Sequence, residues 1–237
     1  MKRIIVLSLS LLLLTVGCNP KHPNKVVIDP EFNPNEVGTI LVTPAFSTVT
    51  EGEDPNRESE KIVNRILWDL LATRGDHEFL SPVQFTYIVQ RSGVAGDLDA
   101  FRAGWNKHHK ADTEFLRKLK EQIGADLLLI THVYLWYKDE TDYRYEVSSS
   151  TTQVGVTLSL IDMDNGNVVW EAMDENYKEA VRSEDGRIRS TTGGLDRRVE
   201  GVTATGRDMY AAPPFEDVST LVLEVLVNAI PRRGVLE

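Results

Sequence analysis

The chain has 237 residues, of which 36 are acidic and 26 are basic, and its formal net charge is −10. This acidity argues against a nucleic-acid-binding protein, which needs a basic surface, and against electrostatic adhesion to anionic lipid. The length fits one domain, or one domain with a large insertion.

The first 17 residues are organised like a bacterial secretory signal. Lys2 and Arg3 precede an apolar run that is too short to span a membrane as a mature helix. The run ends in Thr15-Val16-Gly17-Cys18, which resembles the lipobox at which bacterial lipoproteins are cleaved and lipidated. We therefore predict a signal peptide over residues 1–17 and a lipidated N-terminus at Cys18. An ordinary signal peptide with an incidental cysteine is the alternative.

Lipidation at Cys18 would anchor the protein without spanning the bilayer. Each buried methylene contributes roughly 0.8 kcal/mol, so two or three acyl chains hold a soluble domain stably. Asn19 follows the cysteine, and by analogy with enteric lipoprotein sorting this favours the outer membrane, with the domain facing the periplasm. Cys18 is the only cysteine, so we expect no disulfide, no thiol nucleophile and no cofactor beyond the covalent lipid.

The segment after the lipobox is rich in proline, asparagine and lysine. Residues 18–37 contain four prolines and are predicted to form a flexible, extended tether that precedes a folded domain over residues 38–231. The domain opens with a β-branched strand over residues 39–42, stopped by Pro44.

Three amphipathic helices are predicted next. Asp54 and Pro55 are typical of a helix start, and apolar residues then recur at helical spacing up to Thr73. A short strand is expected over residues 78–81, and Ser81-Pro82 begins a second helix. The pattern fades between Gly93 and Lys110. The third helix runs from Asp112 or Thr113 to a C-cap at Gly124.

The centre of the sheet is predicted at residues 127–137. Leu127–Ile130 is apolar on both faces, as in a central strand that is covered on both sides. Beyond it, strict alternation places His132, Tyr134 and Trp136 on one face and leaves the opposite face to Val133, Leu135 and Tyr137.

A β-hairpin is predicted over residues 154–172. A two-residue turn at Asn165-Gly166 would pair Leu160 with Glu171 and so mix buried and exposed faces. A three-residue loop, Asp164–Gly166 with Gly166 in the left-handed conformation, instead pairs Leu160 with Trp170 and Leu158 with Ala172. We favour this second register.

The last third of the chain is less regular. Residues 173–212 are highly charged and glycine-containing, and we expect an exposed loop or insertion there. Pro213-Pro214 then opens a final amphipathic helix that ends before Pro231. The whole order predicts an α/β (α+β) fold, a mixed β-sheet covered by amphipathic helices.

Three segments resemble a known group of bacterial envelope proteins. They are G-T-I-L-V-T-P-A-F from Gly38, I-G-A-D-L-L-L-I-T-H-V from Ile123 and V-T-L-S-L-I-D-M-D-N-G-N-V-V-W-E from Val156. In this order behind a lipobox they resemble the fold shared by the TolB N-terminal domain, the penicillin-binding-protein activator LpoB and the curli-secretion lipoprotein CsgG, and most closely neisserial-type lipoproteins. The resemblance implies a non-enzymatic adaptor, an activator of envelope enzymes or a secretion-channel component.

No catalytic signature is present. The hydrolase, zinc-protease, phosphate-loop and dinucleotide motifs are all missing, so we expect no enzyme. His108-His109 has no third ligand at metal-binding spacing, and Asp162–Gly166 departs from a calcium loop. His132 is predicted to be a hydrogen-bonded histidine in the core or at a sheet edge.

Two functions of different kinds remain. In the first, an aromatic hairpin with Tyr134, Trp136, Tyr143 and Tyr145, together with the charged segment 173–212, binds an envelope protein partner. Packing within the sheet is the alternative role of these aromatic side chains. In the second, the chain self-assembles into a CsgG-like oligomeric secretion channel of the outer membrane. That channel needs apolar membrane hairpins, and the available segments, residues 137–153 and 173–212, carry many charges.

Overall fold

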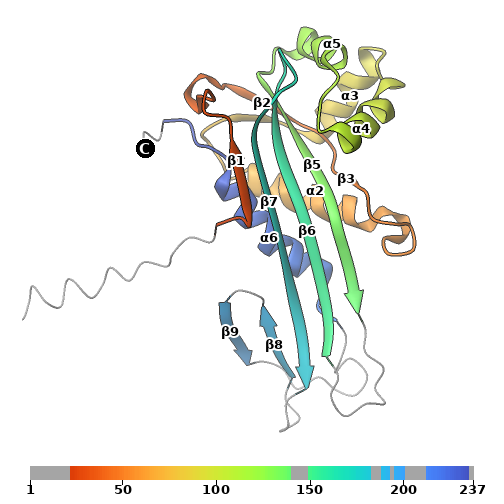
Figure 1. Cartoon of the computed structure of the whole chain (residues 1–237), viewed down its shortest axis with the longest axis vertical. Coiled ribbons are helices and arrows are strands. Elements are labelled where there is room, and N and C mark those ends of the chain that lie inside the picture. Colours follow the sequence, from red (N-terminus) through yellow and green to blue (C-terminus); the bar gives the residue numbers. More distant parts are fainter. Residues whose placement is uncertain (1–21, 140–148, 183–187, 193–194, 201–211, 235–237) are drawn as a thin grey trace, which may run out of the picture.

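Three long antiparallel strands run the length of the molecule (Figure 1). They are β5 (Leu127–Asp139), β6 (Ser149–Asp162) and β7 (Val168–Arg182). The computed structural model describes residues 22–139, 149–182, 188–192, 195–200 and 212–234. Shorter parallel strands extend the sheet beside β5, and an antiparallel hairpin extends it beside β7.

The sheet is mixed, as predicted. β2 (Thr39–Val42) lies parallel to both β5 and β4 (Glu78–Leu80), and β3 (Phe46–Ser47) lies parallel to β5 further along that strand. On the other side, β8 (Ile188–Thr192) pairs with β7 and with β9 (Leu195–Glu200). The order along the main path is β4-β2-β5-β6-β7-β8-β9.

Helices cover the two faces of the sheet unequally. α2 (Glu58–Leu71) and α6 (Phe215–Ala229) pack on one face, where their apolar stripes meet buried residues from Leu127 to Trp136 of β5 and from Val154 to Leu160 of β6. On the other face the described helices cover only one end of the sheet, and they are α3 (Pro82–Arg91), α4 (Asp97–His108) and α5 (Thr113–Ile123). The α/β fold with a mixed, helix-covered sheet is thereby confirmed.

Most of the predicted helix ends are confirmed. Ser81 and Gln84 form a capping box at the start of α3, and Asp112 accepts the backbone N–H of Glu114 at 2.9 Å at the start of α5. Gly124 ends α5 with a φ of +64°. Each of these ends is set by the side chain or the backbone freedom of a single residue, which makes it visible in the sequence.

The start of the first long helix differs from the prediction. Pro55–Arg57 forms the short 3-10 turn η3, in which Asn56 and Arg57 adopt positive φ, so α2 begins only at Glu58. Asp54 still serves this end, because its carboxylate accepts the backbone N–H and the hydroxyl of Ser59. The helix α4 was not predicted, because its buried face consists only of Phe101 and Trp105.

Two predicted loops contain strands. Within the expected tether, residues 18–37, the chain forms β1 (Lys25–Ile28), which pairs antiparallel with β7, and the 3-10 turn η2 (Pro34–Glu36). Within the expected insertion, residues 173–212, β7 continues to Arg182 and is followed by β8 and β9. The prediction of irregular structure is therefore wrong for these parts. The rest of the insertion up to residue 211 lies outside the described residues.

The hairpin between β6 and β7 has the predicted register. Leu160 lies opposite Trp170 and Leu158 opposite Ala172, and Gly166 has a φ of +74°. The backbone N–H of Gly166 donates to the carbonyl of Asp162 at 2.9 Å. The loop itself differs from the prediction, because the backbone N–H of Asp162 donates to the carbonyl of Asn167 at 2.9 Å and Ile161 lies opposite Val168. Leu160 and Trp170 therefore share one buried face through an irregularity at Val169, not through the predicted three-residue loop.

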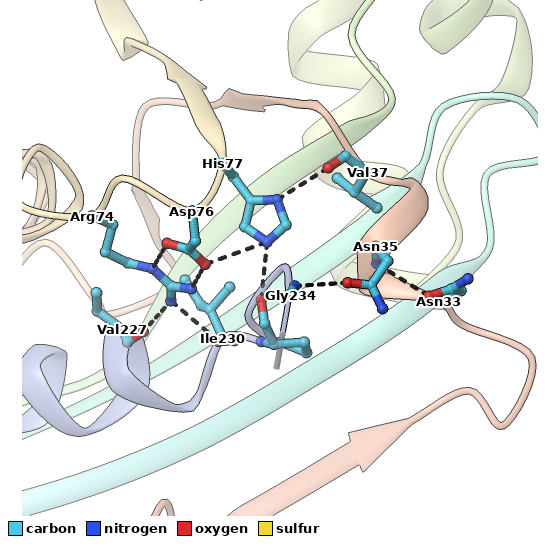
Figure 2. Close-up of polar contacts among 10 residues, drawn as sticks. Asn33, Asn35, Val37, Arg74, Asp76, His77, Val227, Ile230 and Gly234 are labelled. Carbon is cyan, nitrogen blue, oxygen red and sulfur yellow. Dashed lines mark hydrogen bonds and ion pairs between the residues drawn. The ribbon is translucent and has the colours of Figure 1, made fainter. Parts of the chain in front are cut away.

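A buried polar cluster joins both ends of the described chain to the α2–β4 loop (Figure 2). Arg74 forms an ion pair with Asp76 and donates to the carbonyls of Val227 and Ile230 at the end of α6, at 2.6 and 3.2 Å. The ring nitrogens of His77 lie 3.2 Å from the carbonyl of Val37 and 3.0 Å from that of Pro231.

The electrostatics of this cluster favour the ionised carboxylate. Burial alone would raise the pKa of Asp76, but the hydrogen bond and the charge of Arg74 outweigh it and lower that pKa. Arg74 in turn satisfies carbonyls that a helix end leaves unpaired. The cluster therefore has a structural role, closing the domain where its first and last segments meet.

Candidate interaction site at the far end of the sheet

Within the part of the chain that the structure describes, helices cover the far half of the sheet on one face only. We define the far half as residues 132–139 of β5, 149–157 of β6 and 173–182 of β7, and the open face as its side away from α2 and α6. Among the described helices, α3, α4 and α5 reach only the near half, where they pack on Leu128, Ile130 and Ile161. Figure 1 shows the far ends of the three strands extending beyond these helices.

A β-bulge at Tyr134 decides which side chains reach the open face. Val133 lies opposite Val156 and Leu135 opposite Gly155, so Tyr134 is the extra residue. Val133 and Trp136 are consequently both buried beneath the helices α2 and α6, while Tyr134 and Leu135 both lie against Gly155. The predicted common face for His132, Tyr134 and Trp136 is therefore wrong, because strict alternation fails at the bulge.

Tyr134 lies across β6 and reaches β7. A Cβ atom added at Gly155 would come within 2.6 Å of its ring, so only glycine leaves room for the ring there. The Tyr134 hydroxyl donates to the carbonyl of Asp174 at 3.4 Å. Burial, followed by the negative charges of Glu175 and Asp174, raises the pKa of Tyr134 well above its ordinary value. Tyr134 is a half-buried residue that ties three strands together.

The other predicted contact residues have different positions. Trp136 is only 2 % exposed and stacks on Phe215 of α6, with ring centroids 4.0 Å apart. It belongs to the core and offers little surface to a partner. Tyr143 and Tyr145 lie outside the described residues, so their part in binding stays a prediction.

The exposed aromatic residues on the open face are two other tyrosines, Tyr137 and Tyr177. Tyr137 lies opposite Gln153, and Gln153 lies opposite Tyr177, so the three residues form one row across β5, β6 and β7. Tyr137 and Tyr177 are 43 % and 44 % exposed. Tyr177 was missed because its segment was taken for a loop. The alternation of Met173, Glu175 and Tyr177 was the available signal.

A recess lies at the end of β5 on the side of α2 and α6, and Tyr137 is one of its lining residues. Its volume is about 600 Å³, and it lies between the turn before α2, the end of β5 and the start of α6. Phe215, which stacks on the buried Trp136, contributes apolar surface, while Glu53, Glu58 and Glu216 contribute carboxylates and Lys138 contributes an ammonium group. Such a recess suits an apolar side chain that carries a positive charge at its end.

His132 is a hydrogen-bonded histidine, as predicted. Its Nε2 atom lies 2.8 Å from the Thr48 hydroxyl, and its ring stacks on Phe46 at 5.0 Å. Burial, with a smaller contribution from the charge of His109, lowers the pKa of His132 to about 4. The ring is therefore neutral at neutral pH and its hydrogen bond is internal.

The described residues contain no cluster of three or more histidine, cysteine or acidic side chains that could hold a metal ion. None of the helices in the described part of the chain is long and apolar enough to cross a membrane. The features that remain for function are the tyrosine row and the recess.

Comparison with known proteins identifies similar folds at low identity. The lipoprotein GNA1162 from Neisseria meningitidis is 18 % identical, covers 60 % of this chain and 83 % of its own, and has a TM-score of 0.40. The PelC dodecamer from Paraburkholderia phytofirmans is 18 % identical over 88 % of this chain and 97 % of its own, also with a TM-score of 0.40.

The C-terminal domain of LpoB from Salmonella enterica is 11 % identical, covers 62 % of this chain and 85 % of its own, and has a TM-score of 0.35. None of these three structures is a curli-secretion lipoprotein. No protein-family profile and no curated protein sequence matches the chain. TM-scores this low transfer no function to this chain.

Proposed function

We propose that the protein is a lipid-anchored periplasmic lipoprotein of the outer membrane that acts as a non-enzymatic interaction factor in the cell envelope. The lipobox ending at Cys18 supports the anchor. The row of Tyr137, Gln153 and Tyr177 supports the interaction, and it is the observation that carries this part of the proposal.

The physical reason is the character of the row. Tyrosine supplies a large, rigid contact area with a polar tip and loses little conformational entropy on binding, so it is enriched at protein interfaces. Two half-exposed tyrosines on a stiff sheet form a preorganised surface, and the recess at the end of β5 lies on the side of α2 and α6. We expect an envelope protein that presents an apolar segment with a basic residue next to it.

The experiment compares crosslinked complexes in the native envelope. The double variant Tyr137→Ser/Tyr177→Ser should lose at least about tenfold of any crosslinked partner, because interface tyrosines often contribute more than 1 kcal/mol each. The matched control is Tyr87→Ser on α3, a tyrosine that is 61 % exposed and lies near the opposite edge of the sheet. If the wild-type protein, the double variant and the Tyr87→Ser control all crosslink to the partner equally, this location of the interface is contradicted.

Self-assembly into a membrane channel is the alternative function. The lengths of β5, β6 and β7, which are 13, 14 and 15 residues, favour it, because membrane strands need about 9 to 11 residues. The charged residues Lys138, Asp139, Lys178 and Glu179 near the strand ends disfavour it. A Cys18→Ala protein that resists extraction from the membrane would support the channel, and its ready release would exclude it.

A further inference from the structure

The edge strand β1 exposes three apolar side chains in succession. Val26, Val27 and Ile28 are 41 %, 49 % and 53 % exposed. Val26 and Ile28 pair with Ala172 and Trp170, whereas Val27 pairs with Glu171, so apolar side chains project from both faces of the same edge. An uncovered apolar edge strand is an aggregation hazard that native proteins normally cover. Some apolar surface should therefore lie against β1.

The beginning of β1 is firmly attached to the domain. The backbone N–H of Asn24 donates to a carboxylate oxygen of Asp174 at 3.2 Å, and its side-chain amide donates to the carbonyl of Glu175 at 3.4 Å. At the other end, the N–H of Asp29 donates to the carbonyl of Val169 at 2.9 Å. The docked chain therefore starts at Asn24, well before the end of the predicted tether.

This attachment places β1 close to the predicted lipid anchor. Asn24 is six residues after Cys18, and six extended residues span about 20 Å at most, whereas a tether reaching residue 37 would span about 65 Å. A lipidated Cys18 thus keeps β1 within about 20 Å of the bilayer at all times. Because the tether is this short, the local concentration of the membrane at β1 is high.

We propose that β1 is a membrane-contacting edge, on which Val26, Val27 and Ile28 rest in the interfacial layer of the bilayer that holds the lipid on Cys18. The inference depends on the lipid anchor of the proposed function. The unpaired backbone groups of the edge can still bond to water in this layer, which the hydrocarbon core would not allow. The exposed charges nearby are Lys25 on β1 itself and the carboxylates of Glu31 and Glu175, so the edge has no net positive charge and the contact is apolar rather than electrostatic.

Depth-dependent quenching tests the inference. Lipidation occupies the only cysteine, so Val27→Cys in the lipidated full-length mature protein introduces a single free thiol for an environment-sensitive dye. The probe is then measured in phosphatidylethanolamine–phosphatidylglycerol vesicles that contain a doxyl-labelled lipid. The matched control is Val83→Cys on α3, near the opposite edge of the sheet, where valine is 78 % exposed.

We expect the doxyl lipid to reduce emission from position 27 about twofold or more and to leave position 83 unchanged, because only β1 enters the interfacial layer. If the protein floats with the vesicles but neither probe is quenched, the anchor stands and the membrane-contacting edge is refuted. If the lipidated protein does not float, the anchor itself is refuted, together with this inference. The dye at position 27 is also measured in the unlipidated Cys18→Ala/Val27→Cys protein without vesicles. If the dye is already shielded from water there, β1 pairs with a second copy of the chain, and the membrane-contacting edge is refuted.

Discussion

The near and far halves of the three long strands differ in how they are covered. In the near half, β5 lies between two helical layers, and Leu127 to Ile130 are almost fully buried on both faces. In the far half, α2 and α6 are the only described helices that cover the strands, and the open face carries Tyr134, Tyr137 and Tyr177. The near half therefore supplies stability, and the far half supplies accessible surface on the same rigid framework.

The largest expected effect is a loss of unfolding free energy, and it should differ between the near and far halves of the same face of the sheet. Ile130→Ala should lower the free energy of unfolding by about 3 kcal/mol, because Ile130 is 1 % exposed beneath α3–α5 and a cavity would remain. Leu135→Ala, on the open face, should cost about 1 kcal/mol, because the site is already partly solvated. Urea unfolding of the mature Cys18→Ala chain measures both, and equal losses would contradict the contrast.

The bulge offers a second test. Gly155→Ala should cost about 2 kcal/mol, because the new Cβ would lie 2.6 Å from the Tyr134 ring and 2.9 Å from Cβ of Leu135. In a Tyr134→Ala background the same change should cost less, which a double-mutant cycle detects. Gly104→Ala in α4 is the control. It meets no atom within 4 Å and should stabilise the protein slightly. Additive losses would show that Tyr134 does not lie over Gly155.

The boundary between the halves should respond to pH through His132. The pKa of His132 in the folded protein, about 4, lies below the ordinary value of 6.5. Between these two pH values the unfolded chain therefore binds a proton at this residue and the folded chain does not. Stability from this group is complete above pH 6.5 and is lost as the pH falls from 6.5 toward 4, by about 2 kcal/mol after allowing for partial exposure.

His132→Gln should remove this part of the pH dependence, which unfolding curves at pH 7.5 and 4.5 would show. His108→Gln is the control, because His108 is exposed at the end of α4. A wild-type protein and a His132→Gln variant that lose equal stability on acidification would contradict a neutral, buried imidazole.

The smallest effect on stability is expected at the proposed interface. Tyr137→Ser/Tyr177→Ser should change the free energy of unfolding by less than about 1 kcal/mol, because both side chains are more than 40 % exposed. Thermal unfolding measured on the same preparations that are used for crosslinking separates lost binding from lost folding. A large drop in stability would assign these tyrosines to packing instead.

Local patterns predicted much of the fold. The register of the β6–β7 hairpin followed from the need to keep Leu160 and Trp170 on one buried face. The caps at Ser81, Asp112 and Gly124 each depend on one residue and its immediate neighbours. Predictions failed where a segment owes its structure to a distant partner. β1 is a strand only because β7 pairs with it, and residues 173–182 are a strand only because β6 does.

The candidate site was predicted only in part. The sequence pointed to aromatic residues near the end of β5, and the structure does bring exposed tyrosines together there. The extra residue Tyr134 in β5 shifts the alternation of the residues that follow it, so Trp136 lies in the core instead of on the open face. Tyr177 joined the site from a different strand. No periodicity within a single strand reveals a bulge, because the irregularity is defined by the partner strand.

The sequence by itself determined the fold class and most of the helices and strands, because each depends on neighbouring residues or on a regular period, and it is also the whole basis for predicting a secretory signal and a lipobox ending at Cys18. Only the tertiary structure decided where β1 docks, which face Trp136 takes and how Arg74 and His77 join the two ends of the domain. These features arise from contacts between residues that lie far apart in the chain, where the free energy of pairing and burial outweighs local preference.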